Sequence, residues 1–327
     1  MKAVFIDDLT SGRGLSLADV ADPAAPSGTA VLVRVRAAGL NRADLLQAKG
    51  LYPPPPGFSP NIPGLEFAGE VAAVGGDVTE WSVGDRVFGI TAGEAQAEYL
   101  LIDERHLARI PDALSFTEAA AVPEAFITAF DAVVTQAGLA EGETLLVHAV
   151  GSGVGLAALQ IAKARGARVI GTSRTASKLD ACRGFGLDAG IVTAEPVFAD
   201  AVIEATGGRG ADVILDLVGG AYFPENLRSL APKGRVMLVG LTAGRKAEVD
   251  LGMILQKRAT VRGTVLRGRS FDEKCGVTRD FCESVVPLLA DGTLRPVIDR
   301  VFAAADVLAA YDHLASNESF GKVVLEF

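Results

Sequence analysis

The chain has 327 residues, of which 49% are apolar and 6% aromatic, which is enough apolar material for the cores of two domains of ordinary size. A formal net charge of −9, without any run of lysine and arginine, argues against non-specific binding to nucleic acid. The three cysteines, Cys182, Cys275 and Cys282, stand at unrelated spacings and indicate reduced thiols in place of a disulfide framework.

The first 120 residues have the pattern of short strands between turns. The chain opens with a strand-like run at residues 2–6, instead of the charged segment, apolar core and cleavage site of a secretory signal, and this predicts a cytoplasmic protein. Alternating apolar runs follow at residues 30–36, 69–75, 85–89 and 97–101, separated by glycine, proline and aspartate turns. Long helical patterns are absent there, so we expect an antiparallel, barrel-like domain.

A run of prolines interrupts this domain at residues 53–57. Pro53-Pro54-Pro55-Pro56-Gly57 can form neither a helix nor an interior strand, because proline lacks the backbone N–H that both structures need. We expect a stiff extended loop. A structural loop beside a ligand cleft and a motif for protein interaction are both consistent with it.

The most informative segment is residues 144–162. An apolar run to Val147 leads into a turn with three close glycines and then into an amphipathic helix, so that free backbone N–H groups face the strand end, where a pyrophosphate usually binds. The segment carries no formal charge, which would also suit a membrane span, but glycines at its centre favour a turn, and we expect no contact with a membrane. The last glycine, Gly155, stands one residue short of the strict G-x-G-x-x-G spacing.

The residues that follow repeat the alternation of strand and helix. Apolar strands at 168–172, before Leu217 and before Gly240 each follow a helical pattern, which predicts a doubly wound parallel sheet. Ligands of such sheets bind at the carboxyl ends of the strands. The residues that we expect to line that crevice are Gly151, Ser152, Gly153, Val154, Ser173, Arg174, Leu217, Val218, Gly240 and Leu241.

The end of the second strand indicates which dinucleotide binds. A site for NAD usually has an acidic residue there, which accepts hydrogen bonds from the ribose 2′-hydroxyl. This chain instead offers Ser173, Arg174 and Lys178, and hydroxyl and cationic groups suit the 2′-phosphate of NADPH. A solvated basic loop without a ligand is the alternative.

Seven segments along the chain resemble, in the same order, the medium-chain dehydrogenase/reductase superfamily, and in detail its zinc-independent quinone oxidoreductase branch, which is zeta-crystallin-like. They are residues 41–44, 50–53, 63–69, 123–129, 148–155, 266–269 and 321–325. The resemblance implies an α/β fold with a GroES-like β-barrel-type catalytic domain at 1–122 and a Rossmann domain with a doubly wound parallel sheet at 123–266. A return segment of short mixed elements at 267–327 would complete the catalytic domain. The family also implies a homodimer, for which residues 261–266 offer an edge strand.

The resemblance also bears on metals. Zinc-dependent members carry a cysteine where this chain has Asn41 and a Gly-His-Glu where it has Gly64-Leu65-Glu66, and they often add four close cysteines for a second zinc. A catalytic zinc needs about three cysteine, histidine or carboxylate ligands. Because His106, His148 and His313 are scattered, we expect no metal, a structural or pocket role for Glu66, and a packing or supporting role for His148.

Without a Lewis acid, the chemistry must suit an acceptor that takes hydride unassisted. Quinones and activated enones do so because the product is a stable anion, whereas alcohol oxidation needs help in removing the hydroxyl proton. The resemblance places Asn41, Asp44 and Tyr52 near the nicotinamide and substrate as catalytic residues. It places Thr128, Leu266, Arg267 and Lys322 around the cofactor. Two roles stay open for Tyr52, namely orienting and protonating the substrate carbonyl, or packing against the nicotinamide amide.

Three departures from the family pattern concern the substrate and adenine pockets and not the fold. They are Leu46 where several relatives have tyrosine, Val192-Thr193 where an Asn-Tyr pair is frequent, and Arg174 where glycine is common. We interpret the chain as an NADPH-dependent quinone oxidoreductase that acts on a small-molecule quinone or enone. Reduction of α,β-unsaturated carbonyls, including enoyl thioesters, is the alternative reaction. A cofactor-binding protein of low activity is the alternative of a different class.

Overall fold

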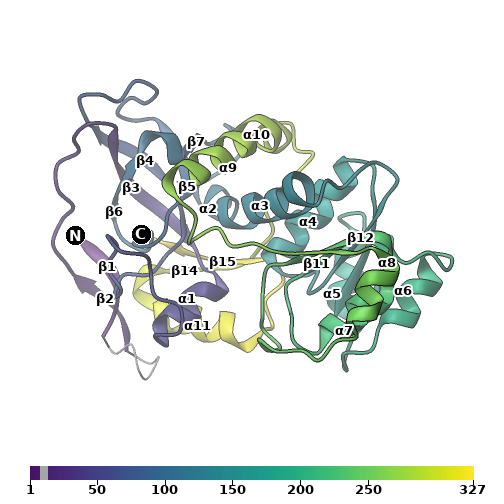
Figure 1. Ribbon diagram of the computed structural model, residues 1–327. Coiled ribbons are helices and arrows are strands. Elements are labelled where there is room, and N and C mark those ends of the chain that lie inside the picture. Colours follow the sequence, from purple (N-terminus) through teal and green to yellow (C-terminus); the bar gives the residue numbers. More distant parts are fainter. Residues whose placement is uncertain (8–13) are drawn as a thin grey trace. The chain divides into compact units, whose positions relative to one another are not determined.

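The computed structural model describes residues 1–7 and 14–327 and divides the chain into two compact units (Figure 1). Unit 1 combines Met1–Ile127 with Leu266–Phe327, and unit 2 is Thr128–Val265. The sequence-based boundaries lie after residues 122 and 266, whereas these units divide after residues 127 and 265. The first division falls inside helix α3 (Pro123–Phe130).

Unit 1 is built on a seven-stranded sheet. Its strand order is β14-β15-β3-β4-β5-β7, and β6 pairs with β3 off this path. All pairings are antiparallel except that of β14 with β15, as expected for the first part of the chain. The strands are β3 (Ala30–Gly39), β4 (Glu66–Val74), β5 (Arg86–Ile90), β6 (Tyr99–Asp103), β7 (Leu107–Arg109), β14 (Ile298–Ala303) and β15 (Lys322–Glu326), with a separate antiparallel pair β1 (Lys2–Ile6) and β2 (Leu15–Asp19).

The alternation of apolar residues along these strands explains the core of unit 1. Val31, Val33 and Val35 on β3 all point to the buried face, because successive side chains of a strand alternate between faces. They pack with Phe67 of β4 and Val87 of β5 in one cluster. Pro53–Gly57 forms neither helix nor strand, as the proline run predicts.

The helices of unit 1 are mostly short, with one exception that the sequence did not predict. They are α1 (Arg42–Ala48), α2 (Phe116–Ala120), α9 (Phe271–Ser284), α10 (Val286–Ala290) and α11 (Val307–Ser316). The expectation of only short elements after residue 266 was wrong, because α9 has 14 residues. Ser270 and Glu273 form a capping box at its start, and that pattern marks a helix N-terminus.

Unit 2 is a doubly wound parallel sheet, as predicted. Its order is β10-β9-β8-β11-β12-β13, so the chain runs outward from β8 to β10 and then continues on the other side of β8. The strands are β8 (Thr144–Val147), β9 (Arg168–Ser173), β10 (Ala189–Val192), β11 (Ala211–Asp216), β12 (Leu230–Leu238) and β13 (Thr260–Gly263), and all pairs are parallel. This reversal of strand order between β8 and β11 is where ligands of open α/β sheets bind.

The connections of unit 2 are helical. They are α4 (Gly153–Ala164), α5 (Ala176–Arg183), α6 (Ala199–Ala205), α7 (Tyr222–Ser229) and α8 (Leu251–Lys257). The central strands are buried along their whole length, which explains their continuous apolar sequence. Residues 144–162 thus form a strand, a turn and a helix, and within the described parts of the chain we find no helix that is both long and apolar enough to cross a membrane.

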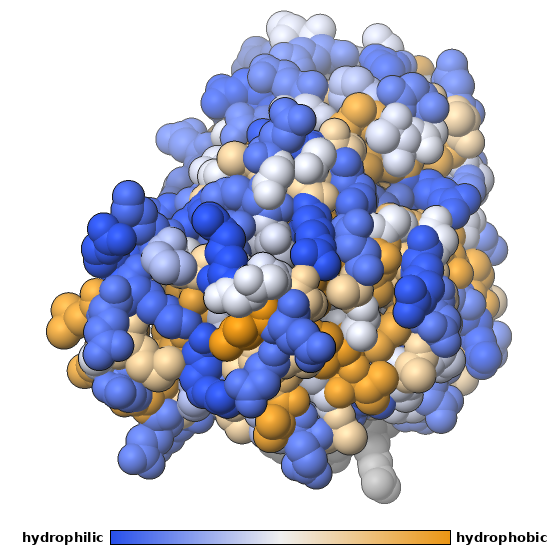
Figure 2. Space-filling view, turned by 90° about the vertical axis from the view of Figure 1, so that its right-hand side faces the viewer, coloured by the Kyte–Doolittle hydropathy of each residue, from blue (hydrophilic) through white to orange (hydrophobic). Residues whose placement is uncertain are grey.

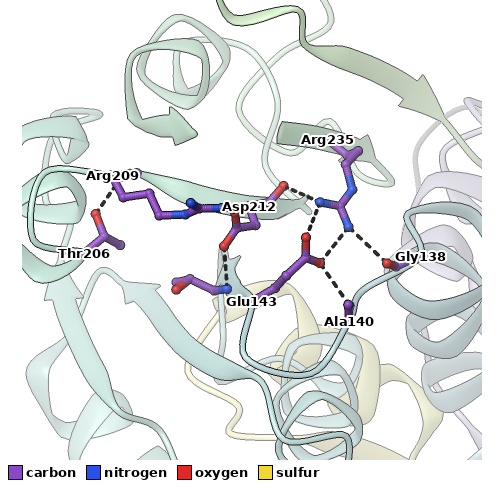
Figure 3. Close-up of polar contacts among 9 residues, drawn as sticks. Gly138, Ala140, Glu143, Thr206, Arg209, Asp212 and Arg235 are labelled. Carbon is purple, nitrogen blue, oxygen red and sulfur yellow. Dashed lines mark hydrogen bonds and ion pairs between the residues drawn. The ribbon is translucent and has the colours of Figure 1, made fainter. Parts of the chain in front are cut away.

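A network of charged side chains links the segments near the amino ends of β8 and β11 in unit 2 (Figure 3). The guanidinium of Arg235 donates to both carboxylate oxygens of Glu143, at 2.8 and 2.7 Å, and to the Gly138 carbonyl oxygen at 3.1 Å. The carboxylate of Asp212 accepts from the backbone N–H of Thr144 and from Arg209. The hydrogen bond from Arg235 lowers the pKa of Glu143, so this pair is ionised at neutral pH.

Candidate functional site

The turn between β8 and α4 has the geometry of an anion site. Ser152 caps the helix, since its hydroxyl oxygen accepts from the backbone N–H of Gly155 at 3.2 Å. A Cβ atom at Gly155 would lie 2.6 Å from the carbonyl oxygen of Ala149, so the helix approaches the turn too closely for any side chain there. This crowding explains why a glycine stands at position 155, one residue before the last glycine of the strict G-x-G-x-x-G spacing. The backbone N–H groups of the first helical residues, Gly153 and Val154, have no acceptor within the helix and face its N-terminal end.

A buried network of hydrogen bonds joins three strand ends in unit 2. His148 follows β8 and is fully buried, and its Nδ1 lies 2.9 Å from the hydroxyl oxygen of Thr172 on β9. Its Nε2 lies 2.6 Å from Oδ1 of Asn226. The Asn226 amide nitrogen donates to Oδ2 of Asp216, the last residue of β11, at 2.8 Å. Because Asn226 directs its NH₂ group to a carboxylate, its oxygen must accept from His148, which fixes the proton on Nε2.

The same network holds the loop after β11. The other oxygen of Asp216 accepts from the backbone N–H groups of Val218 and Gly219, both at 2.8 Å. Burial lowers the pKa of His148, against the opposing charge of Asp216, so the ring stays neutral. The expected supporting role of His148 therefore has a structural counterpart.

The predicted cofactor residues that follow β8, β9, β11 and β12 lie at one edge of the unit 2 sheet, because these strands are parallel neighbours. Gly240 approaches the Leu217 carbonyl so closely that a Cβ atom would lie 2.5 Å from its oxygen. Leu217 and Val218 are half-buried and Leu241 is exposed. Thr128 is buried.

The segment after β9 carries the residues from which a preference for NADPH is predicted. Ser173 is buried, and its hydroxyl oxygen accepts from the backbone N–H of Thr175 at 3.3 Å. Arg174 is exposed, and Lys178 lies half-buried in the first turn of α5. Residues 173–179 contain no acid. The end of β9 is therefore followed by an exposed guanidinium and a half-buried ammonium, with a buried hydroxyl on the strand itself.

In unit 1, a buried ion pair lies between β4 and β15. The ammonium of Lys322 donates to the Leu40 carbonyl oxygen and to Oδ1 of Asn41, both at 2.7 Å, and to Oε1 of Glu66. An ammonium has three N–H donors, so all are used. The Glu66 carboxylate is fully buried and also accepts from the Asn41 amide at 2.9 Å and from the Glu124 backbone N–H at 2.8 Å. Glu66 therefore has the structural role expected from the sequence.

Asp44 lies beside this pair and is incompletely bonded. Its Oδ2 accepts from the backbone N–H of Asn41 at 2.8 Å and from the Gln96 amide at 3.3 Å, and its Oδ1 is buried without a partner. Burial raises the pKa of Asp44 to about 6. The Gln96 oxygen in turn accepts from the hydroxyl of Tyr311 at 2.9 Å.

Arg267 holds the segment that carries Tyr52. Its guanidinium donates to the carbonyl oxygens of Ala92 and Tyr52, both at 2.8 Å, and to the side-chain oxygen of Gln47. It also lies 5.0 Å from the centre of the Tyr52 ring, a cation–π distance. The neighbouring Leu266 is buried. Tyr52 is half-buried, and burial raises its pKa. The contacts of Arg267 in the structure are thus with unit 1, although the sequence placed it around the cofactor.

Glu124 and Asn226 are residues of these networks that were not singled out from the sequence. Glu124 is an acid after a proline at a helix start, which is an ordinary place for an acid because of the helix dipole. Asn226 and Thr172 have no local motif, and only contacts between distant residues show their role. In the portion of the chain that the structure describes, no three or more His, Cys, Asp and Glu side chains are grouped to hold a metal ion.

Comparisons with known proteins agree with this architecture. Residues 27–130 match the family model of the alcohol dehydrogenase GroES-like domain, and residues 153–280 match that of zinc-binding dehydrogenase. "Quinone oxidoreductase-like protein 2" of Bos taurus is 33% identical, across 90% of this chain and 84% of that protein. The polyketide synthase component PikAII of Streptomyces venezuelae is 35% identical across 98% of this chain, which corresponds to 8% of that much longer protein.

The similar solved structures include a quinone oxidoreductase and an enoyl reductase. A quinone oxidoreductase of Pseudomonas syringae pv. Tomato DC3000 is 33% identical with a TM-score of 0.89, and the match covers 100% of this chain and 99% of that chain. The enoyl reductase CurK is 26% identical with a TM-score of 0.87, covering 99% and 98% of the two chains.

Proposed function

Because the chain belongs to the medium-chain dehydrogenase/reductase family of oxidoreductases, whose members bind a nicotinamide dinucleotide, we propose that it is an NADPH-dependent quinone oxidoreductase that works without zinc. NADPH supplies the hydride when bound. NADPH would be held by residues of the β8–α4 turn, of the loops after β11 and β12, and of the segment after β9 that carries Arg174 and Lys178.

The observation that carries the zinc-free part of this proposal is the position of Lys322. Its ammonium uses its three donors on Leu40, Asn41 and Glu66, so it takes up the polar groups around Asn41 that a metal ion would need. Leu65 offers no donor atom, and the amide of Asn41 is engaged by Lys322 and Glu66. A zinc ion would need cysteine, histidine or carboxylate ligands that are free to bind it.

This arrangement favours an acceptor that needs no Lewis acid. A quinone takes hydride readily because the hydroquinone anion is stable. The side chains of unit 1 then have two tasks: Arg267 positions Tyr52 for contact with the acceptor, and the buried ion pair of Glu66 and Lys322 keeps Asn41 and the start of α1 in place.

The preference for NADPH over NADH is supported by residues 173–178. Arg174 and Lys178 are cations where a site for NAD would need an acid. A charge-assisted hydrogen bond to the 2′-phosphate contributes about 1.5–3 kcal/mol, which corresponds to tenfold or more in affinity.

A second reaction has support of its own. The similarity to the polyketide synthase PikAII spans nearly the whole chain, and the enoyl reductase CurK has the same fold. Reduction of α,β-unsaturated carbonyls, including enoyl thioesters, is therefore the alternative to quinone reduction. A cofactor-binding protein of low activity would show tight NADPH binding and negligible turnover with both classes of acceptor.

We also infer a homodimer formed through β13. This strand is one of the two outer strands of the unit 2 sheet, the other being β10, and all four residues of β13 are exposed. Val261 and Val265 are exposed apolar residues there, as is Leu255 of α8. On the face drawn in Figure 2, apolar side chains gather in separate patches between hydrophilic ones.

The cofactor assignment is tested by measuring the dissociation constants of NADPH and NADH. Replacing Arg174 and Lys178 together with alanine should weaken NADPH tenfold or more and leave NADH nearly unchanged. Arg165 and Arg168, which are exposed and lie at the opposite end of β9, provide a matched double-alanine control. An equal loss for both cofactors would rule out the assignment.

A further inference from the structure

Glu124 is a half-buried acid whose carboxyl group forms no ion pair with any residue that the structure describes. Its backbone N–H donates to Glu66, but among the described residues its carboxyl group makes no hydrogen bond. Lys322, whose positive charge acts on Glu124, uses all three of its ammonium donors on other acceptors. Arg267 is directed to Ala92, Tyr52 and Gln47.

The remaining charged groups around Glu124 act through space. Glu66 and Asp44 disfavour its negative charge, whereas Lys322 and Arg267 favour it. Lys274 of α9 is buried and is within electrostatic reach, and its own pKa is lowered by burial. Tyr52 also experiences the charge of Glu124.

Glu66 and Glu124 therefore have different partners, although the backbone N–H of Glu124 donates to the Glu66 carboxylate. Glu66 is stabilised as a carboxylate by an ammonium, an amide and a backbone N–H. Burial, with the adjacent Glu66 carboxylate adding to it, raises the pKa of Glu124 to about 8. A carboxyl group whose pKa is raised by burial beside a second carboxylate is a frequent arrangement in acid–base catalysis.

We propose that the Glu124 carboxyl group donates the proton that converts the reduced acceptor anion into the neutral product. The inference rests on the proposed function. Hydride addition gives the acceptor two electrons and leaves an oxyanion. The O–H bond of Glu124 then breaks, directly or through one water, and an O–H bond forms on the product. The Glu124 carboxylate regains a proton from solvent through its exposed face, so that one proton is consumed per turnover.

Other candidate donors fit this step less well. Asp44 is fully buried, so it has no exposed face through which to exchange protons. Lys322 is saturated with acceptors. Tyr52 is a weaker acid than usual because burial raises its pKa, which makes it better suited to orienting the acceptor than to protonating it at neutral pH.

The kinetic test uses the variant Glu124→Gln, which keeps the size of the side chain and removes its proton. For the wild-type protein, kcat/KM for a quinone should fall as the pH rises through about 8. The variant should be ten- to a hundredfold slower at pH 6.5, and this decrease with pH should be absent. Tyr52→Phe should lower the rate and retain the decrease. Glu204→Gln, an exposed site on α6, should behave as wild type.

A second readout does not depend on activity. In cofactor-free protein, infrared difference spectroscopy should show the carbonyl band of a protonated carboxyl disappearing with a midpoint near pH 8, and Glu124→Gln should lack this band. If wild type reduces quinones and Glu124→Gln retains both the rate and its pH dependence, the role of Glu124 is refuted while the proposed function stands. If none of the quinones tested is reduced by wild type with NADPH, the proposed function fails. The donation step, which rests on that function, then fails with it.

Discussion

The polar networks of the two units differ in how completely their atoms are paired. In unit 2, His148, Thr172, Asn226 and Asp216 are linked in a continuous chain, and the described side-chain atoms of this chain all have partners. In unit 1, the cluster around Glu66 and Lys322 leaves one Asp44 oxygen without a partner and gives Glu124 no bonded cation. A fully paired network fixes a geometry, whereas partly paired buried acids titrate near neutral pH.

This difference suggests that the two networks have different roles. The unit 2 network holds the loops at the carboxyl ends of β8, β9 and β11, and burial lowers the pKa of its histidine, His148. The unit 1 cluster contains the two acids with raised pKa values, Asp44 and Glu124. We therefore expect changes in unit 2 to alter cofactor affinity, and changes in unit 1 to alter stability and proton transfer.

The largest effect is expected when the buried ion pair is broken. Lys322→Met leaves the Glu66 carboxylate buried without its cation, and loss of one partner of a buried pair costs about 3–5 kcal/mol of unfolding free energy. Urea denaturation would measure it. Adding Glu66→Gln to Lys322→Met should recover part of the loss, because no unpaired charge remains. If Lys322→Met alone were as stable as wild type, the ion pair of Glu66 and Lys322 would not be desolvated.

A smaller effect is expected in the unit 2 network. Asn226→Ala leaves Nε2 of His148 and one oxygen of Asp216 without partners, which should cost about 1–3 kcal/mol and weaken NADPH binding through the loop after β11. Ser229→Ala, on the same helix, removes a buried hydroxyl that is outside the network and provides the control. Unchanged NADPH affinity in a destabilised Asn226→Ala protein would contradict the positioning role.

The smallest effect concerns the pH dependence of stability. The pKa of Glu124 is about 8 in the folded protein and about 4.5 when unfolded, so the folded state binds more protons between these values. The contribution of this group is complete below about pH 4.5 and is lost as the pH rises through about 8. Glu124→Gln should therefore match wild type at pH 4.5 and exceed it at pH 9, by about 1–2 kcal/mol after allowance for partial exposure. A constant difference across this range would refute the raised pKa.

The sequence predicted the fold well where a local pattern determines structure. The apolar run of β8, the glycines and the amphipathic α4 follow one another within residues 144–162, and short-range geometry fixes their arrangement. The crowding at Gly155 shows why the motif is one residue short. Helix α9 was missed because its apolar residues are interrupted by Gly276 and several charges, although its capping box was visible.

The site was less predictable because its contacts join distant residues. Glu124 is 58 residues from Glu66, and Asn226 is 78 residues from His148. No local pattern indicates that the three donors of Lys322 are all used, and only this saturation makes Glu124 unusual. The resemblance identified the segments, but the pairing of their side chains required the structure.

Turnover of the metal-depleted protein is the most direct test of quinone reduction without zinc. The protein would be treated exhaustively with a chelator, its zinc content measured, and NADPH oxidation followed with ortho- and para-quinones and, in parallel, with enones and enoyl thioesters. We expect undiminished quinone reduction without stoichiometric zinc, with kcat/KM at least as high for quinones as for the other acceptors. Activity that returns only with one zinc per chain, or enoyl thioesters reduced much faster than any quinone, would contradict it.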